Sequence, residues 1–243
     1  MTSIEFLDYQ SLSEQAAQMV IDTLSDKPEA LLCFASGDTP RGLFAQLVKH
    51  YRAGTVDFSR ASYVGLDEWV GMNRHDAGSC ADLLYHEFLD LVNFLPENTA
   101  FFDGKSGNLN AECRRINRFV RERSAIDILV LGIGMNGHLG LNEPGLSWRT
   151  YSRVTDLAPV TKSVAQKYFE DQTTLSQGIT LGVRHFREAE KVLLMLSGAK
   201  KTPVLQKLQQ GDIDPNFTAT AMHLHDNTFL LYDRAAGGEG LEV

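Results

Sequence analysis

The chain has 243 residues, 43% of them hydrophobic and 22% charged, which is ordinary for a globular protein with a sizeable core. Its net charge of -8 argues against a general nucleic-acid binder, and no apolar run approaches the ~18–20 residues of a membrane span. Three widely spaced cysteines without a C-x-x-C pair, and an N-terminus without a signal-peptide pattern, predict a soluble cytoplasmic protein with reduced thiols.

The first half of the chain predicts two buried strands with a helix between them. Residues 29–35 (EALLCFA) are largely apolar and predict a strand, and the tight loop SGDTP follows at 36–40. From 41 to 51 the apolar side chains recur at helical spacing. Residues 61–66 (ASYVGL) predict the second strand, which ends at the polar triplet DEW.

The second half continues the alternation. A charged helix is predicted over 108–124, followed by a strand over 126–131. A further strand over 191–196 leads through a small-residue turn into a helix that ends at Gln209, and residues 228–232 predict the last strand.

Strands that alternate with helices predict an α/β fold: a doubly wound, mostly parallel, Rossmann-like sheet with helices on both faces. We expect one domain over residues 1–243, because neither repeats nor a linker are visible. Ligands of such sheets lie beyond the carboxyl ends of the strands. Four polar or glycine-rich segments follow strand ends here and are expected to converge on one crevice: 36–40, 67–69, 132–143 and 197–201.

Two of these segments predict anion sites. Between the first strand and its helix, free N–H groups and the helix dipole favour an anion beside Ser36, Gly37, Asp38 and Thr39. The alternative is that Asp38 or Thr39 simply caps the helix. The segment SGAKK repeats the arrangement and adds Lys201, for which a solvated lysine pair is the ordinary alternative.

Asp67 and Glu68 are adjacent carboxylates at the end of the second strand. A partly desolvated carboxylate there would have a raised pKa and could act as a base for proton abstraction. Successive residues of an extended backbone point to opposite sides, so only one of the two should face a ligand. A solvated acidic turn is the competing interpretation.

The stretch LGIGMNGHLGLNEPG at 131–145 contains the pattern G-x-G-x-x-G of dinucleotide-binding loops. In those loops the third glycine leads into a helix, whereas here another glycine and a proline follow it. We therefore reject a dehydrogenase and interpret the stretch as a flexible loop that carries reactive side chains.

That loop carries His138 between Asn136 and Glu143. A histidine titrates near neutral pH, and a neighbour bonded to one ring nitrogen leaves the other for a substrate. A histidine hydrogen-bonded for structure alone is a fair rival interpretation. No metal site is expected, because an amide is a weak third ligand beside an imidazole and a carboxylate.

Five motifs together resemble the glucosamine-6-phosphate deaminase family, whose superfamily includes the 6-phosphogluconolactonases. They are ASGDTPRG (35–42), LDEW (66–69), GIGMNGHLGLNEPG (132–145), GITLGV (178–183) and LSGAKK (196–201). The resemblance covers nearly the whole chain and looks closest to the galactosamine-6-phosphate deaminase/isomerase branch.

The resemblance implies a reaction without cofactor or metal in which an amino-sugar phosphate becomes a ketose phosphate and ammonia. His138 would open the sugar ring with support from Glu143 and Asn136, and Asp67 would move a proton from C2 to C1. It further implies the classes hydrolase, isomerase and deaminase, a phosphorylated amino sugar as partner, and no nucleic acid or membrane. A homo-oligomer is left open as the assembly.

Members of the family often carry a phosphate-binding arginine in the helix after the catalytic loop, and we match this position to Tyr168. Phosphate binding is therefore expected from the loop 36–39 and Lys201, with Lys167 or Arg184 as further candidate cations. Two other functions stay open: a lactone hydrolase, disfavoured because lactonases resemble G-H-x-A-S-L-F-P, and a non-catalytic sugar-phosphate sensor.

Overall fold

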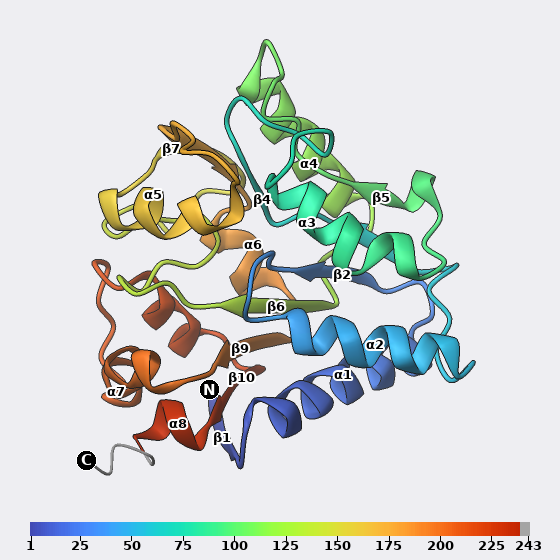
Figure 1. The fold of residues 1–243 in the computed structure, drawn as a ribbon, viewed down its shortest axis with the longest axis vertical. Coiled ribbons are helices and arrows are strands. Elements are labelled where there is room, and N and C mark those ends of the chain that lie inside the picture. Colours follow the sequence, from blue (N-terminus) through green and yellow to red (C-terminus); the bar gives the residue numbers. More distant parts are fainter. Residues whose placement is uncertain (239–243) are drawn as a thin grey trace.

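The computed structural model describes residues 1–238, and its centre is a seven-stranded sheet in which all neighbouring strands run parallel (Figure 1). In sheet order the strands are β1 (Thr2–Phe6), β10 (Thr228–Asp233), β9 (Val192–Leu196), β6 (Ile128–Gly132), β2 (Leu31–Phe34), β3 (Ser62–Val64) and β5 (Thr99–Ala100). The predicted α/β fold with a mostly parallel sheet is confirmed. The strands predicted from the apolar runs are present as β2, β3, β6, β9 and β10, with slightly shifted ends.

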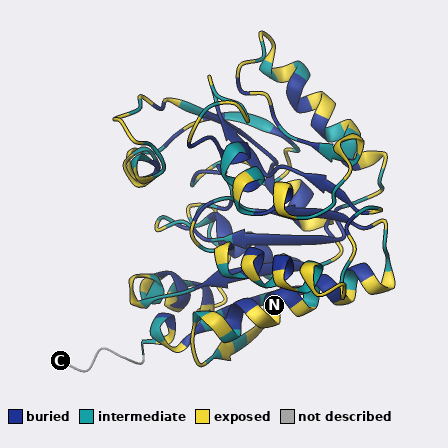
Figure 2. Cartoon of the chain, turned by 45° about the vertical axis from the view of Figure 1, so that its right-hand side comes forward, coloured by how far each residue is buried: buried dark blue, intermediate teal, exposed yellow. Residues whose placement is uncertain are grey.

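Helices cover both faces of this sheet. Successive strand residues alternate between two apolar clusters, so Leu31 packs on one side and Leu32 on the other. One side is covered by α1 (Tyr9–Asp26), α2 (Arg41–Arg52) and α3 (Cys80–Glu87). The other side is covered by α4 (Leu109–Arg121), α6 (Val183–Glu188), α7 (Thr202–Gln209) and the 3₁₀ helix η5 (Thr218–Leu224). Figure 2 shows the result as a buried sheet between helices whose outer faces are exposed.

A second, antiparallel sheet was not predicted. It consists of β4 (Asp67–Trp69), β8 (Gln177–Thr180) and β7 (Arg153–Asp156), with Asp67 paired to Thr180. Its core residue Ile179 joins the same apolar cluster as α4 and α6. The small sheet therefore places the polar triplet DEW on a rigid, buried strand, and the alternative of a solvated acidic turn is wrong.

Shorter elements complete the described chain, and β1 and α1 near the N-terminus were also not predicted. The remaining helices are α5 (Pro159–Ala165), α8 (Arg234–Gly237) and the 3₁₀ turns η1 (Leu89–Leu91), η2 (Pro96–Asn98), η3 (Gln166–Tyr168) and η4 (Ala199–Lys201). No helix within residues 1–238 combines the length and the apolar character needed to cross a bilayer.

The chain order reverses between β2 and β6, which lie side by side. From β2 the chain proceeds to β3 and β5 on one side, and it then crosses to β6, β9 and β10 on the other. Such a reversal opens a crevice at the carboxyl ends of the two central strands, where open α/β sheets bind ligands.

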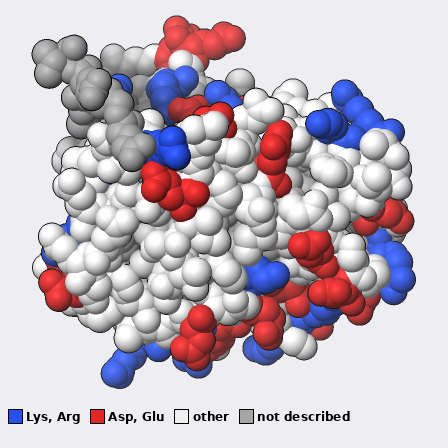
Figure 3. All heavy atoms as spheres, turned by 90° about the horizontal axis from the view of Figure 1, so that it is seen from below, with Lys and Arg blue, Asp and Glu red and all other residues white. Residues whose placement is uncertain are grey.

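The charged side chains seen from below Figure 1 are mixed in sign and gather toward the rim (Figure 3). Among the described residues, that face offers nucleic acid no continuous basic surface.

Candidate active site

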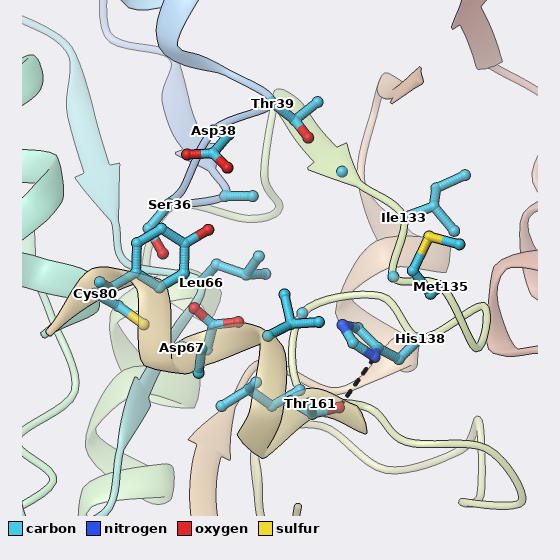
Figure 4. Close-up of a pocket in the computed structure, with 18 of the residues that line it drawn as sticks. Ser36, Asp38, Thr39, Leu66, Asp67, Cys80, Ile133, Met135, His138 and Thr161 are labelled. Carbon is cyan, nitrogen blue, oxygen red and sulfur yellow. Dashed lines mark hydrogen bonds between the residues drawn. The ribbon is translucent and has the colours of Figure 1, made fainter. Parts of the chain in front are cut away.

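A cavity of about 640 Å³ lies at the reversal point of the sheet. Its walls include residues from all four segments that were expected to converge: 36–40, 67–69, 132–143 and 197–201. The volume is in the range typical of small-molecule sites. The convergence predicted from strand ends is confirmed, and Figure 4 shows Asp67 and His138 extending into the same space from different elements.

Asp67 presents the carboxylate of this cavity. It begins β4 and is only 8% exposed, while the following Glu68 is fully buried and does not line the cavity. Burial, followed by repulsion from the Glu68 charge, raises the pKa of Asp67 to about 7, and a contact with the Cys80 thiol partly opposes this rise. Such a carboxylate is half ionised near neutral pH and can take a proton from carbon more readily than an exposed one.

His138 faces Asp67 from the loop that follows β6. The backbone of Gly134 lies directly against the imidazole, and a Cβ there would collide with the ring. Gly137 adopts φ +81°, in the left-handed region that favours glycine, and so turns the chain back toward the histidine. The close contact at Gly134 and the positive φ at Gly137 explain why glycine stands at these two positions. No helix follows before α5, so the rejection of a dinucleotide loop is consistent with the structure.

Glu143 and Asn136 lie behind the histidine and do not line the cavity. The Glu143 carboxylate is 3.7 Å from His138 Nδ1, and it accepts bonds from Asn136 Nδ2 at 2.9 Å and Thr161 Oγ1 at 2.6 Å. The Asn136 carbonyl accepts the backbone N–H of His138 at 3.3 Å and does not bond the ring.

This arrangement fixes both the place and the protonation behaviour of the imidazole. Burial lowers the pKa of His138, the Glu143 charge raises it, and Lys201 lowers it further. The ring is therefore mainly neutral at pH 7, with a buried anion ready to stabilise its protonated form. Thr161 Oγ1 also lies 3.5 Å from Nδ1 (Figure 4). Glu143 and Thr161 thus lie on the Nδ1 side of the ring, and the rest of the ring faces the cavity.

The predicted anion loop reaches the cavity through Ser36, Asp38 and Thr39. Gly37 does not line it, because the Tyr168 hydroxyl lies over that backbone and would collide with a Cβ. The residue before α2 is Pro40, without a side-chain cap, so the alternative of a simple Asp38 or Thr39 cap is not observed.

Cations reach the same side of the cavity from two other elements. Lys201 is half-buried and donates to the Ile133 carbonyl oxygen, and Lys167 pairs with the Asp38 carboxylate. Both lysines line the cavity. Arg184 does not: it pairs with Glu188 at 2.8 Å and lies over Tyr151, so the suggestion that it binds phosphate is wrong.

The second predicted anion loop, 197–201, offers fewer free hydrogen-bond donors than its sequence led us to expect. Its Ser197 hydroxyl and Gly198 N–H both donate to the carboxylate of Asp233. Those two donors are therefore not free to bind an anion. Within residues 1–238, no group of three or more His, Cys, Asp or Glu side chains is placed to hold a metal ion.

Sequence reasoning missed several residues that shape the site. Tyr9 donates to the Thr39 carbonyl at 2.8 Å and accepts the Gly42 N–H at 2.7 Å, which holds the anion loop. Thr161 and Cys80 were missed as well, since no motif marks either of them. Their place in the cavity depends on packing between segments that are distant in sequence.

Comparison with known proteins identifies the same superfamily as the motifs. A family model described as "Glucosamine-6-phosphate isomerases/6-phosphogluconolactonase" matches residues 8–230. The protein named glucosamine-6-phosphate deaminase 1 in Bacillus subtilis is 33% identical over 237 residues, which cover 97% of this chain and 98% of that protein. A glucosamine-6-phosphate deaminase of Halalkalibacterium halodurans is 32% identical, covering 97% and 96%.

Solved structures agree with these matches. A chain described as a monomeric glucosamine-6-phosphate deaminase superposes with a TM-score of 0.95 at 33% identity, covering 98% of this chain and 99% of that one. A 6-phosphogluconolactonase from Thermotoga maritima gives a TM-score of 0.75 at 15% identity over 96% and 98%, and shares the fold. The class hydrolase, expected from sequence beside isomerase and deaminase, is wrong, because the similar proteins are named as deaminases.

Proposed function

The chain belongs to the glucosamine-6-phosphate isomerase/6-phosphogluconolactonase family, and on that premise we propose that it converts a 2-amino-2-deoxyhexose 6-phosphate to the ketohexose 6-phosphate and ammonia. The observation that carries the proposal is the pair Asp67 and His138, which extend into one cavity from β4 and from the loop after β6. A deaminating isomerase needs two such groups: one that opens the sugar ring by proton transfer, and one that removes the proton from C2.

The neutral imidazole of His138 suits the first step. It accepts the proton of the anomeric hydroxyl and then delivers a proton to the ring oxygen, so that the ring opens. The imidazolium formed in between is stabilised by Glu143, 3.7 Å from Nδ1. Asn136 and Thr161 hold Glu143 in place by their hydrogen bonds. Glu143 and Asn136 lie outside the cavity wall and act through His138, whereas Thr161 also lines the cavity.

The carboxylate of Asp67 suits the second step. It removes the C2 proton of the open-chain sugar and returns it to C1, which leaves an iminium at C2. Water then adds to this iminium carbon, and the carbinolamine so formed expels ammonia and leaves the C2 ketone. A pKa of about 7 makes Asp67 a stronger base than an ordinary aspartate while leaving much of it ionised. The sugar phosphate is held by the loop of Ser36 and Thr39 together with Lys201 and Lys167. No cofactor enters any of these steps.

Glucosamine 6-phosphate is the first candidate substrate, because the similar proteins are named for it. Galactosamine 6-phosphate is the second, because the motifs LDEW, GHLGLNEPG and GITLG resemble the galactosamine branch. We also propose a cytoplasmic location, since Cys33, Cys80 and Cys113 are buried and unpaired.

The test is ammonia release from both epimers, with 6-phosphogluconolactone as a parallel substrate. We expect release from at least one epimer. Asp67→Asn should reduce turnover by roughly 10²–10⁴-fold and abolish deuterium incorporation at the transferred position in D₂O. Asp22→Asn, on the exposed side of α1, is the control and should leave turnover unchanged. Full activity of Asp67→Asn, or turnover of the lactone alone, would overturn the proposal.

A further inference from the structure

Glu68 is a buried carboxylate that the steps above do not use. It follows Asp67 on β4, its side chain is 0% exposed, and it lies outside the cavity wall. A buried carboxylate that meets no cation is costly unless hydrogen bonds compensate it. Its position beside the proposed base therefore needs an explanation.

The compensation comes from the backbone of α3. Oε1 of Glu68 accepts the N–H of Trp69 at 2.9 Å and that of Cys80 at 2.9 Å, and Oε2 accepts the N–H of Ala81 at 3.0 Å. Cys80 and Ala81 are the first two residues of α3, where backbone N–H groups have no partner inside the helix. The carboxylate thus joins β4 to the positive end of a helix. Burial raises the pKa of Glu68 to about 7, and the three N–H groups oppose this rise because they favour the ionised form.

The same connection reaches the cavity. Cys80 gives its N–H to Glu68, and its thiol lies in the cavity wall in contact with Asp67. The backbone of Asp67 is continuous with that of Glu68. A change in the Glu68 contacts would therefore shift both the base and the thiol beside it.

In its ionised form Glu68 also acts on Asp67 through its charge. Other groups around Asp67 are the Cys33 thiol on β2, the Tyr63 hydroxyl on β3 and the Cys80 thiol on α3. Burial raises the pKa of each of them well above its usual value, so all three are neutral near pH 7. Across the cavity lie His138, which is mainly neutral, and Lys201. Glu68 is the neighbouring negative charge that opposes ionisation of Asp67.

We propose that Glu68 is a positioning residue for the deamination: its carboxylate fixes β4 to the N-terminus of α3 and, when ionised, places a negative charge beside Asp67. This inference rests on the proposed function only in assigning Asp67 as the base. It separates two effects, geometry and charge, that different substitutions can distinguish.

Two substitutions at Glu68 distinguish the effect of its charge from the effect of its position. Glu68→Gln keeps the shape but removes the charge and places an amide against backbone N–H groups. It should lower the apparent pKa of the acid limb of kcat/KM by about half a unit or more and reduce kcat at alkaline pH by roughly 3-fold or more. Glu68→Asp keeps the charge but is too short to reach all three N–H groups. This variant should leave the apparent pKa of the acid limb unchanged and have a lower kcat.

Glu112→Gln is the matched control. Glu112 is also buried, accepts the Asp103 N–H at 2.8 Å and pairs with Arg115 at 2.6 Å, but it lies on α4 outside the cavity wall. Glu112→Gln should have a lower free energy of unfolding but an unchanged apparent pKa of the acid limb. An unchanged limb in Glu68→Gln would overturn the charge effect, and an unchanged kcat in Glu68→Asp would overturn the geometric one.

A measurement on the unmodified protein keeps the inference testable without turnover and without a variant. In a carbon-13 NMR titration of the side-chain carboxyls, Glu68 should ionise at lower pH than Asp67, because only Glu68 has three N–H partners. Asp67 ionising first would overturn the inference. This order is independent of ammonia release, so a failure of the proposed function and a failure of the Glu68 role can be told apart.

Discussion

Replacement of Asp67 by Asn is expected to stabilise the protein, and the gain should grow as the pH rises from about 4 to about 7. The pKa of Asp67 rises from the ordinary 3.8 to about 7 because the carboxyl is buried beside Glu68. The folded state therefore binds this proton more tightly than the unfolded state does. The stability contributed by the site is fully present below pH ~4 and is lost as the pH rises toward about 7.

The size of the effect follows from the shift. A rise of about 3 pKa units corresponds to about 4 kcal/mol at ~1.4 kcal/mol per unit, as an upper bound. An amide at the same place leaves some of its own polar atoms without partners, which costs ~1–2 kcal/mol. We therefore expect a net gain of about 2–3 kcal/mol in the free energy of unfolding. For a chain of 243 residues this corresponds to roughly 5–10 °C in Tm.

The assay is thermal unfolding of both proteins, followed by circular dichroism at about pH 5 and about pH 8.5. The gain should be large at the higher pH and small at the lower one. Asp127→Asn is the control, because Asp127 is as little exposed as Asp67 but pairs with Lys27 at 2.8 Å and accepts the Leu31 N–H at 2.7 Å. It should lose stability. A lower Tm for Asp67→Asn at about pH 8.5, or an equal gain at both pH values, would refute the reasoning.

Three further outcomes are expected. The acid limb of kcat/KM should titrate with an apparent pKa near 7, because Asp67 must be ionised to act as the base; a limb below about pH 5 in the free enzyme would contradict this. Lys201→Met should raise KM for the sugar phosphate about 10-fold or more, whereas Lys49→Met on the exposed face of α2 should not, and steady-state kinetics decide between them. Thr161→Val removes the 2.6 Å bond to Glu143 and should lower kcat roughly 5–50-fold with little change in KM; a change in KM alone would place Thr161 against the substrate instead.

Local patterns in the sequence were enough to identify five strands of the central sheet, β2, β3, β6, β9 and β10, and the position of its crevice. The apolar runs at 126–131 and 191–196 became β6 and β9, since a fully buried parallel strand needs a short continuous apolar segment. The helical spacing over 41–51 became α2. The carboxyl ends of parallel strands meet at one edge, so the polar segments that follow them had to converge.

Local patterns also predicted that one of two adjacent carboxylates would face the ligand, because side chains alternate along an extended backbone. They did not show which one. The pairing of β4 with β8 made that choice by directing Asp67 into the cavity and Glu68 toward α3. These two strands are short and lie more than a hundred positions apart in the chain, and a local pattern carries no information about such a partner.

The sequence by itself therefore determined the α/β class, the sheet edge at which the cavity lies and the residue types available there. The tertiary structure alone decided that Thr161 and Asn136 hold Glu143 in place, that Tyr168 covers Gly37 and that Arg184 lies elsewhere. The physical reason is the range of the interactions. Strand and helix formation follow from the spacing of neighbouring apolar residues, whereas the orientation of a buried polar side chain depends on hydrogen-bond partners that only packing of distant segments supplies.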